Sequence, residues 1–443
     1  MLPIPSVKHM DKVRHMLYKI SPCASIPVVR HTPLEYNNRL SAHFGANIYF
    51  KREDLQPVRS FKIRGAAALI SSLSDVERAK GIVCASAGNH AQGVAQTCNV
   101  LGLTADIFVP ESTPNQKISR IINFSNQDNF KLHRVGSNFD ECLAASLAFS
   151  NQNDKAYIHP YNHLETIAGQ GTIGAEIFED CEGLEIEPDY IMGSIGGGGL
   201  MSGIGAYSRG QGREGRCHVI GVEPSSWPSM TMAFKNKGPI EVKCQDNFVD
   251  GATVPKVGDV TFDVCSQVID SIKVVDVGSL CSTMLELYQD DGIIVEPAGA
   301  LPVTALSQLP DINNKTVVCI ISGGNNDISR YPDIVERSLR YKKLKHYYVV
   351  EFGQKPGALM KFVKDVLGPN DDITRFEYVK KTNRDFGSAL IGVEVSEPDD
   401  AVMITARLRQ NGFVYRKLGD LDEPQESPKS TDGIEEALLQ YIV

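Results

Sequence analysis

The stretch that decides the fold reads YIMGSIGGGGLMSG and spans residues 190–203. Its first part is almost wholly apolar, which is typical of a strand buried on both faces of a parallel sheet. Four consecutive glycines then remove every Cβ from the turn before a helical pattern begins. Backbone N–H groups in such a turn can converge on an anion at the start of the helix. The stretch therefore predicts an α/β fold that binds a phosphate group at the carboxyl end of a strand.

The glycine turn does not match the two common nucleotide motifs. The pattern G-x-x-x-x-G-K-[ST] is missing here, which disfavours a nucleotide-binding P-loop. No acidic residue follows a second strand at the place where a ribose would need one, which excludes a dinucleotide-dependent dehydrogenase. A flexible turn without a ligand is the alternative to a phosphate site.

Composition narrows the class of protein. The 443 residues are 42% hydrophobic and 22% charged, as in soluble globular proteins, and the length suggests roughly two to three domains. The formal charge of −9 and the lack of a Lys/Arg block disfavour nucleic-acid binding. Two prolines and several charges interrupt residues 1–20, so we expect neither a signal peptide nor a membrane span. These features predict a cytoplasmic protein without nucleic-acid or membrane partners.

The cysteine pattern points the same way. Ten cysteines are scattered between Cys23 and Cys319, and none forms a C-x-x-C pair. Cys84 and Cys319 lie inside apolar, strand-like runs. We expect small buried thiols in a reducing compartment, and neither a disulfide framework nor a zinc site.

Short apolar runs alternate with helical patterns from about residue 45 to residue 325. This order predicts parallel sheets covered by helices on both faces. Eight runs are too many for one small sheet, so we expect two α/β lobes with a cleft between them. The expected strands are residues 47–51, 81–86, 105–110, 131–135, 190–196, 218–224, 273–277 and 316–322.

The pattern changes after a short basic connector at residues 337–346. The following elements have the order βαββαβ, which is the ferredoxin-like plan. We expect a two-lobed domain over residues 1–335, a second domain over 346–420, and a polar tail with a short terminal element over 421–443. The expected elements of the second domain are strand 347–352, helix 356–368, strands 373–381 and 388–396, helix 399–412 and strand 413–418.

Two more polar stretches follow expected strands. SAGNHAQG (86–93) opens a helix, and its free backbone N–H groups suit a carboxylate, while Asn89 and His90 could bind a ligand. The alternative is simple N-capping by Ser86 or Asn89. SGGNND (322–327) follows the last strand of the two-lobed domain, and Ser322 could present its hydroxyl to a heteroaromatic nitrogen. The alternative there is an ordinary turn.

Lys62 lies between Phe61 and Ile63 in VRSFKIRGA (58–66), just before an Ala-rich segment. Taken alone, the stretch favours a helix start whose lysine reaches water. In VEPAGA (295–300), Pro297 suits a first helical turn. Glu296 can then be a favourable charge at the positive end of that helix dipole.

Four motifs occur in a characteristic order: Ser-Phe-Lys at 60–62, SAGNHAQG, GGGGL and SGGN. The combination resembles the tryptophan-synthase-β type of pyridoxal-phosphate enzymes, the fold type II group that includes serine and threonine dehydratases. This resemblance covers about residues 25–330. QKPGALMKFVKDVLGPNDDITRFEYVKK, within 346–420, resembles the ACT-like regulatory domain of biosynthetic threonine dehydratases with one such module.

The resemblance implies roles for individual residues. Lys62 would bond covalently to pyridoxal 5'-phosphate and act as the catalytic base, with Phe61 beside it. Asn89 would bind the 3'-oxygen of the cofactor, and Ser322 its ring nitrogen. A serine cannot keep that nitrogen protonated as an aspartate would, which suits β-elimination. The implied phosphate ligands are Gly196, Gly197, Gly198, Gly199 and Leu200, and the implied ligands of the substrate carboxylate are Ser86, Ala87, Gly88, Asn89 and His90.

The resemblance also implies a function. The enzyme would be a threonine ammonia-lyase that dehydrates and deaminates L-threonine to 2-oxobutanoate and ammonia, the first step of isoleucine biosynthesis. L-Serine is a second candidate substrate, isoleucine and valine are the expected opposing effectors, and a homo-oligomer (tetramer or dimer) is expected. The alternatives are a catabolic serine/threonine dehydratase and an amino-acid sensor without catalysis. The ferredoxin-like domain could also serve oligomerisation alone.

Two departures from related enzymes narrow the expectation. Ala87 stands where serine racemases carry a second serine, so we expect elimination without racemisation. Glu223 is present where racemase-like members bind a divalent ion, but Ser229 replaces the second carboxylate. We therefore expect no metal at Glu223.

Overall fold

The computed structural model describes residues 26–243, 246–378 and 385–419. The chain divides into two compact units, Met1–Asn326 and Asp327–Val443. The expected polar tail and its terminal element at 421–443 lie outside the described residues, as does the stretch that argued against a signal peptide.

The first unit contains a six-stranded sheet with the order β1-β2-β10-β7-β8-β9. All neighbouring strands are parallel except β1, which pairs antiparallel with β2. Every residue of β10 is buried, as the continuous apolar run predicts for a central strand. The strands are β1 (Leu34–Tyr36), β2 (Asn47–Arg52), β7 (Tyr190–Ser194), β8 (His218–Pro224), β9 (Ser271–Val275) and β10 (Thr316–Ile321).

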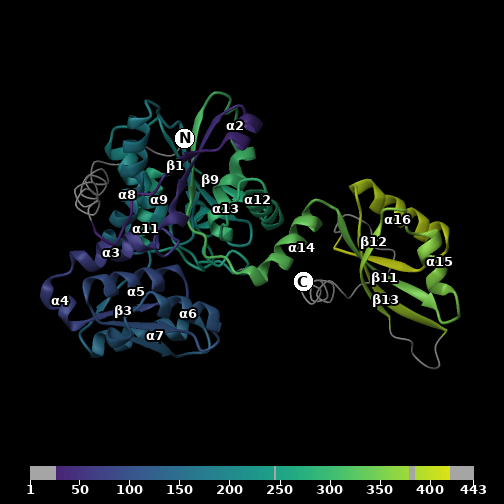
Figure 1. The fold of residues 1–443 in the computed structure, drawn as a ribbon, viewed down its shortest axis with the longest axis horizontal. Helices are drawn as coiled ribbons and strands as arrows, with labels where there is room; N and C mark the ends of the chain where they lie inside the picture. Colours follow the sequence, from purple (N-terminus) through teal and green to yellow (C-terminus); the bar gives the residue numbers. More distant parts are fainter. Residues whose placement is uncertain (1–25, 244–245, 379–384, 420–443) are drawn as a thin grey trace. The chain divides into compact units, whose positions relative to one another are not determined.

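Helices cover both faces of this sheet (Figure 1). On one face, α9 packs against the sheet and against α8 and α11, and its Leu200, Met201 and Ile204 join a core with alternate strand residues. The other face is covered by α13, which contacts β7, β8 and β10 and also packs against α12. These helices are α8 (Leu164–Gly183), α9 (Gly199–Gly210), α11 (Asp259–Val268), α12 (Val277–Gln289) and α13 (Pro297–Thr304).

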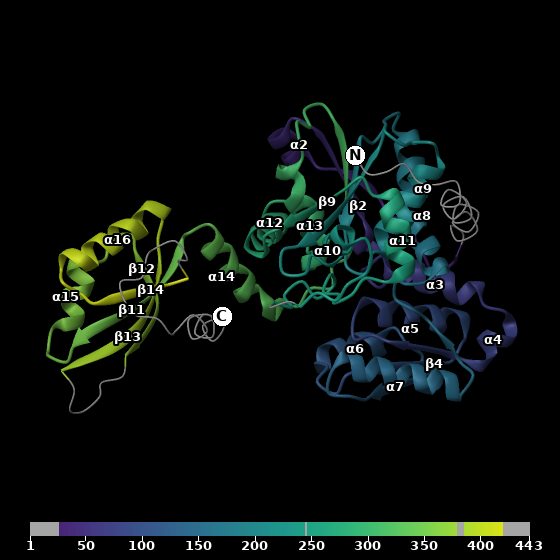
Figure 2. The same cartoon turned by 180° about the vertical axis from the view of Figure 1, so that it is seen from behind.

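The second sheet of this unit has the order β5-β4-β3-β6, and all its strands are parallel. Helix α5 packs on one face together with α3, whereas Cys142 of α7 packs on the other. Helix α3 contacts both α5 and α8, so it lies at the boundary of the two lobes (Figure 2). The elements are β3 (Ile82–Ala85), β4 (Ala105–Val109), β5 (Phe130–Arg134), β6 (Ala156–Tyr157), α3 (Lys62–Ser72), α5 (Asn89–Leu101) and α7 (Phe139–Gln152).

The predicted fold class is confirmed for this unit, with two α/β lobes built on parallel strands. All eight expected strands are present to within a few residues. The prediction missed β1 and β6, because strands of three and two residues are too short to show an apolar period.

The second unit is built on a four-stranded antiparallel sheet with the order β12-β13-β11-β14. Helices α15 and α16 share one core with it. The chain order is βαββαβ, so the predicted ferredoxin-like plan is confirmed. The elements are β11 (Lys345–Gly353), α15 (Ala358–Asp365), β12 (Asp372–Tyr378), β13 (Phe386–Glu394), α16 (Pro398–Gln410) and β14 (Tyr415–Leu418).

The predicted basic connector at 337–346 was wrong in detail. Its first half belongs to helix α14 (Tyr331–Tyr341), which has a proline in its first turn. Ile334 and Ser338 lie one helical turn apart and are buried, whereas Arg337 and Arg340 are half-buried. The first half of the basic stretch therefore belongs to a helix with one buried face.

Two further observations bear on the class of protein. Eight cysteines in the described part of the chain are buried and form no disulfide, in agreement with the expectation of small buried thiols. Among the described residues, no helix is both long enough and apolar enough to cross a membrane.

Candidate active site

The polar stretches singled out in the sequence lie at the carboxyl ends of parallel strands or at the helix starts that follow them. Lys62 and Asn89 are the first residues of α3 and α5, and the glycine turn joins β7 to α9. Ser322 directly follows β10. In open α/β sheets this edge is where ligands bind.

Lys62 is half-buried, and its amine has few partners. Its Nζ donates to the Pro160 carbonyl oxygen at 3.3 Å and lies 5.2 Å from the centroid of the Phe61 ring. Burial lowers the pKa of Lys62 to about 8, although the nearby Glu296 carboxylate acts in the opposite direction. A lysine with this pKa is partly neutral near pH 7 and can accept a proton.

The backbone before Lys62 is tied to the strand end that carries Ser322. The Phe61 N–H donates to the Ser322 carbonyl oxygen at 3.1 Å, and the Gly324 N–H donates to the Arg59 carbonyl oxygen at 3.0 Å. Arg59 has a φ of 56°, a strained left-handed conformation that costs roughly 1 kcal/mol or more. The Ser322 hydroxyl is buried and lies 3.4 Å from the hydroxyl of Ser194 at the end of β7. Three of the predicted stretches therefore meet here.

The glycine turn leaves no room for side chains. A Cβ on Gly197 would lie 2.3 Å from a ring carbon of Tyr161, and one on Gly196 would lie 3.0 Å from the Ala252 Cα. Gly198 caps α9 with a φ of 91°, which only glycine adopts easily. Leu200 lies below the turn in the buried core. No side chain of Gly196 to Gly199 therefore stands at this helix N-terminus, as a phosphate cradle requires.

The 86–90 loop offers polar groups without a net charge. The Ser86 hydroxyl accepts the Gly88 N–H at 3.2 Å. Ala87 packs against the core of the small lobe, which is the lobe built on the sheet β5-β4-β3-β6. The His90 Nε2 lies 2.8 Å from the Ile158 carbonyl oxygen and must donate to it, because a carbonyl only accepts. Burial, with Lys62 adding to the effect, lowers the pKa of His90 to about 3, so this ring is neutral at physiological pH.

Asn89 does not act as the helix cap that the sequence allowed. The N-cap of α5 is Gly88, and no side chain caps this helix end. Instead, the Asn89 Nδ2 donates to both carboxylate oxygens of Glu296 at 2.9 Å, and its Oδ1 accepts from the Asn325 Nδ2 at 2.8 Å. The capping alternative was therefore wrong for Asn89, and also for Ser86, whose hydroxyl bonds only within its own turn.

Glu296 is more than a charge at a helix start. It is the N-cap residue of α13, but its side chain makes no capping hydrogen bond and turns to Asn89. Burial raises the pKa of Glu296 to about 7, although the hydrogen bond from Asn89 acts against this shift. The sequence marked this residue only as a favourable helix-dipole charge.

The sequence interpretation missed the segment that follows β6. Besides the Pro160 carbonyl that accepts from Lys62, it carries the Tyr161 ring that lies against Gly197. His159 shapes the segment, because its Nδ1 accepts the Asn162 N–H at 2.9 Å. The signal was present as a polar and aromatic stretch after a strand, but a two-residue strand is easily overlooked.

The same segment also supports the helix behind the glycine turn. The Asn162 Oδ1 accepts the Val260 N–H at 2.9 Å in the first turn of α11, which lacks a side-chain cap of its own. Burial lowers the pKa of His159 to about 4, with Lys62 acting in the same direction, so His159 is also neutral near pH 7. The segment is thus an ordered wall between Lys62 and the glycine turn.

Glu223, at the end of β8, has three hydrogen-bond donors. Its carboxylate accepts the N–H groups of Met230 at 2.6 Å and Thr231 at 2.8 Å and the Thr231 hydroxyl at 2.7 Å. These donors lie in the first turn of α10 (Ser229–Asn236). The described residues contain no group of three or more His, Cys, Asp or Glu side chains that could hold a metal. The absence of a metal at Glu223 stays a prediction.

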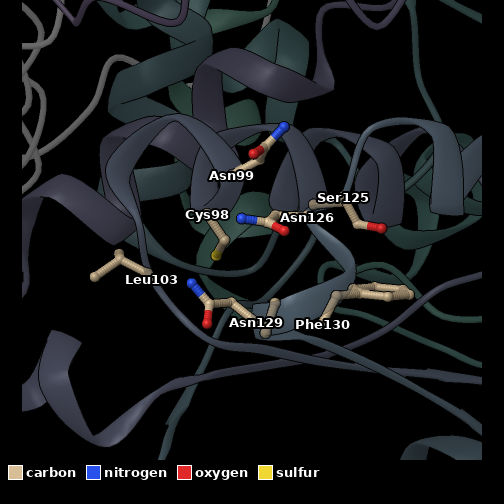
Figure 3. A pocket seen from close by; sticks show the side chains of 9 residues that line it. Cys98, Asn99, Leu103, Ser125, Asn126, Asn129 and Phe130 are labelled. Carbon is tan, nitrogen blue, oxygen red and sulfur yellow. The ribbon is translucent and has the colours of Figure 1, made fainter.

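A small cavity elsewhere in the small lobe is lined by none of the predicted site residues (Figure 3). Ala105 and Phe130, the first residues of β4 and β5, line it, so it lies at the amino edge of the sheet, away from the strand ends described above. Its lining consists of Ala95, Cys98, Asn99, Leu103, Ala105, Ser125, Asn126, Asn129 and Phe130.

The residues that meet at the strand ends fit pyridoxal phosphate. No side chain fits in the glycine turn, the half-buried Lys62 amine has a lowered pKa, and Ser322 presents a buried hydroxyl at the end of β10, the strand between β2 and β7. Asn89 has an oriented amide close to the same strand end. Phosphate, aldehyde, ring nitrogen and 3'-oxygen therefore each have a candidate partner.

Comparison with known proteins supports this interpretation. Residues 26–323 match the family model described as pyridoxal-phosphate dependent enzyme. Residues 336–425 match the model of the C-terminal regulatory domain of threonine dehydratase.

Curated relatives match most of the chain. An L-threonine dehydratase biosynthetic IlvA from Staphylococcus epidermidis is 47% identical over 385 residues, which are 86% of this chain and 90% of that protein. The protein of the same name from Halalkalibacterium halodurans is 46% identical over 392 residues, 88% of this chain and 93% of its own.

Solved structures match about three quarters of the chain. The processed form of threonine deaminase isoform 2 from Solanum lycopersicum has a TM-score of 0.70 and 33% identity, and the match covers 76% of this chain and 96% of that chain. A maize serine racemase has a TM-score of 0.64 and 27% identity, with 75% and 98% coverage.

Proposed function

Because the chain belongs to the pyridoxal-phosphate-dependent threonine dehydratases with a C-terminal regulatory domain, we propose that it converts L-threonine to 2-oxobutanoate and ammonia for isoleucine synthesis. One observation carries the proposal. The half-buried Lys62 amine has a lowered pKa and donates to the Pro160 carbonyl, and the next residue, Tyr161, packs on a glycine turn without space for side chains. An amine, an anion cradle and a buried serine hydroxyl meet at one sheet edge.

The proposed cofactor contacts follow the groups that each residue presents. Lys62 would bond to the aldehyde carbon, beside Phe61, and Ser322 would bind the ring nitrogen. Asn89 would bind the 3'-oxygen. The backbone N–H groups of the glycine turn and of the first residues of α9 would hold the phosphate, and these residues are Gly196, Gly197, Gly198, Gly199 and Leu200. When bound, the cofactor supplies an electron sink that stabilises the carbanion formed by loss of the Cα proton.

The chain's own residues perform the remaining tasks. The 86–90 loop binds the substrate carboxylate through backbone N–H groups at the start of α5, where the helix dipole favours an anion. The uncharged His90 adds no competing charge to this loop. Lys62, once its amine is free, removes the Cα proton of threonine. The β-hydroxyl leaves as water, and hydrolysis of the dehydrated product releases 2-oxobutanoate and ammonia.

The assay for this function is the formation of 2-oxoacid from L-threonine and from L-serine by the full-length protein loaded with the cofactor. We expect threonine to be the better substrate and Lys62→Ala to abolish both reactions and the visible absorbance of the bound cofactor. Lys315→Ala, which removes an exposed lysine paired with Asp189, should behave as wild type. A fully active Lys62→Ala protein would refute the assignment. A strong preference for serine would favour the catabolic alternative.

Regulation is assigned to residues 346–420, with residues 1–335 as the catalytic domain. We propose that isoleucine binds the ferredoxin-like domain and inhibits, and that valine opposes it, which requires isoleucine to bind the less active state more tightly. Isoleucine is titrated against full-length protein and against a variant lacking residues 346–443 that still deaminates threonine. Equal inhibition of both would contradict this assignment.

The remaining assignments concern the state of the enzyme in the cell. We propose a homo-oligomer, tetramer or dimer, on the basis of the family alone, and sedimentation analysis measures its size. The cytoplasm is the proposed location, since the eight described thiols are free and buried, as in a reducing compartment. Elimination without racemisation is proposed from Ala87, and detection of D-allothreonine or D-serine would contradict it.

A further inference from the structure

Two side-chain amides form a chain between a backbone carbonyl and a carboxylate. The Asn325 Nδ2 donates to the Val58 carbonyl oxygen and to the Asn89 Oδ1, both at 2.8 Å. The Asn89 Nδ2 donates to Glu296 Oε1 and Oε2, both at 2.9 Å. The Val58 carbonyl can only accept hydrogen bonds, and the Glu296 carboxylate only accepts when it is ionised. With Glu296 ionised, the direction of each amide is therefore determined from both sides.

The Glu296 carboxylate lies between the two stretches expected to hold the cofactor ring. On one side it accepts from Asn89, at the start of α5. On the other side it lies against Gly323, where a Cβ would come within 2.7 Å of Oε1. The Glu296 N–H also donates to the Gly323 carbonyl oxygen at 3.0 Å. Gly323 directly follows Ser322, so one buried carboxylate contacts both sides of the site.

We propose that Glu296 is a positioning residue for the cofactor, which holds the Asn89 amide in the orientation that donates to the 3'-oxygen and places a negative charge beside Lys62. The inference rests on the proposed function, because it requires pyridoxal phosphate to be bound. The two oxygens of one carboxylate are too close together to occupy both N–H directions of a planar amide. One N–H of Asn89 is therefore left for the cofactor.

The charge of Glu296 acts on Lys62 directly. Two charged groups influence this buried carboxylate, Asp250 and Lys62, and only Lys62 is a cation. The attraction is mutual, since the carboxylate in turn raises the pKa of the Lys62 amine. Removal of the negative charge therefore disfavours the protonated form of the Lys62 nitrogen.

The first test is a double-mutant cycle on cofactor affinity. Full-length apoprotein is titrated with pyridoxal phosphate and followed by absorbance, for wild type, Glu296→Gln, Asn89→Ala and the double variant. Glu296→Gln keeps the shape but loses the charge and one acceptor. We expect it to weaken binding about tenfold in the wild-type background, the size of one lost charged hydrogen bond. In the Asn89→Ala background we expect a clearly smaller effect, because Glu296 then has no amide to orient and only its charge near Lys62 is lost.

The second test is spectroscopic. The pH midpoint of the visible absorbance of the bound cofactor should fall by about one unit in Glu296→Gln, because the adjacent cation loses its counter-charge. Glu223→Gln is the matched control. Glu223 is also a buried carboxylate whose pKa burial raises to about 7, but its partners are in α10 and it does not influence Lys62. This control should leave the midpoint unchanged.

A third variant separates the two parts of the proposal. Glu296→Asp keeps the charge and withdraws it from Asn89, so it should weaken cofactor binding with little change in the pH midpoint. It also carries the test if Glu296→Gln does not fold. Three results would each overturn the inference. Glu296→Gln could weaken cofactor binding equally in both backgrounds, it could leave the pH midpoint of the absorbance unchanged, or Glu296→Asp could bind the cofactor with wild-type affinity. Failure of the wild-type protein to bind pyridoxal phosphate at all would instead refute the proposed function.

Discussion

A methyl group added at Gly197 tests the glycine turn and its contact with Tyr161 together. In Gly197→Ala the new Cβ would lie 2.3 Å from Cγ of Tyr161 and 2.5 Å from both Cδ atoms. Ordinary carbon–carbon contact is about 3.5 Å, so the ring must move by about 1 Å. Tyr161 follows Pro160, whose carbonyl accepts from Lys62. The displacement therefore disturbs both the turn and the lysine.

The expected magnitude follows from overpacking. Forcing one methyl group into a filled site costs about 1–3 kcal/mol. If this cost falls on the state that binds the cofactor, affinity decreases between about fivefold and a hundredfold. The assay is titration of full-length apoprotein with pyridoxal phosphate. Gly183→Ala is the control, since no atom lies within 4 Å of the added Cβ there, and its affinity should equal that of wild type.

The second half of this prediction is rescue. Tyr161→Ala removes the ring that the new methyl group meets, so the double variant Gly197→Ala, Tyr161→Ala should bind the cofactor more tightly than Gly197→Ala alone. If the double variant binds no better, the clash with Tyr161 is not the cause. If Gly197→Ala binds as wild type does, the turn is not the phosphate cradle.

Three further predictions concern stability and pH. Arg64→Met should lower the free energy of unfolding, measured in urea, by about 3–5 kcal/mol. The reason is that Glu53 remains as a fully buried carboxylate without its bidentate partner. A loss below about 1 kcal/mol would contradict this. His90 has a pKa of about 3 in the folded state, below the unfolded value of about 6.5, so the unfolded state binds more protons between these pH values. The free energy of unfolding should therefore rise with pH by about 1.4 kcal/mol per unit in this range. His90→Gln should remove this contribution, which urea unfolding at pH 5 and pH 6 measures. Lys117→Met breaks a half-exposed ion pair with Asp250, 2.9 Å long, and should change the unfolding free energy by less than about 1 kcal/mol; a larger loss would show that this pair matters more than its exposure indicates.

Much of the fold could be predicted because its signals are local. Continuous apolar runs such as residues 316–321 predict buried parallel strands, and helical patterns between them predict the covering layers. The order βαββαβ was equally readable in the second unit. The sequence predictions were wrong where the local signal is weak. They missed the two-residue strand β6, and they interpreted the basic residues at the end of α14 as a linker.

The sequence by itself determined which residues are candidates for the chemistry. A lysine after Ser-Phe, four glycines at a strand end and a serine after the last strand are recognisable in a few consecutive residues, because close backbone approach and an amine need particular residue types at particular places. Only the tertiary structure decided how these residues are held. Asn89 is oriented by Glu296, which is 207 residues away, and Lys62 donates to Pro160, 98 residues away. Such contacts depend on which strands become neighbours, and spacing along the chain does not encode that.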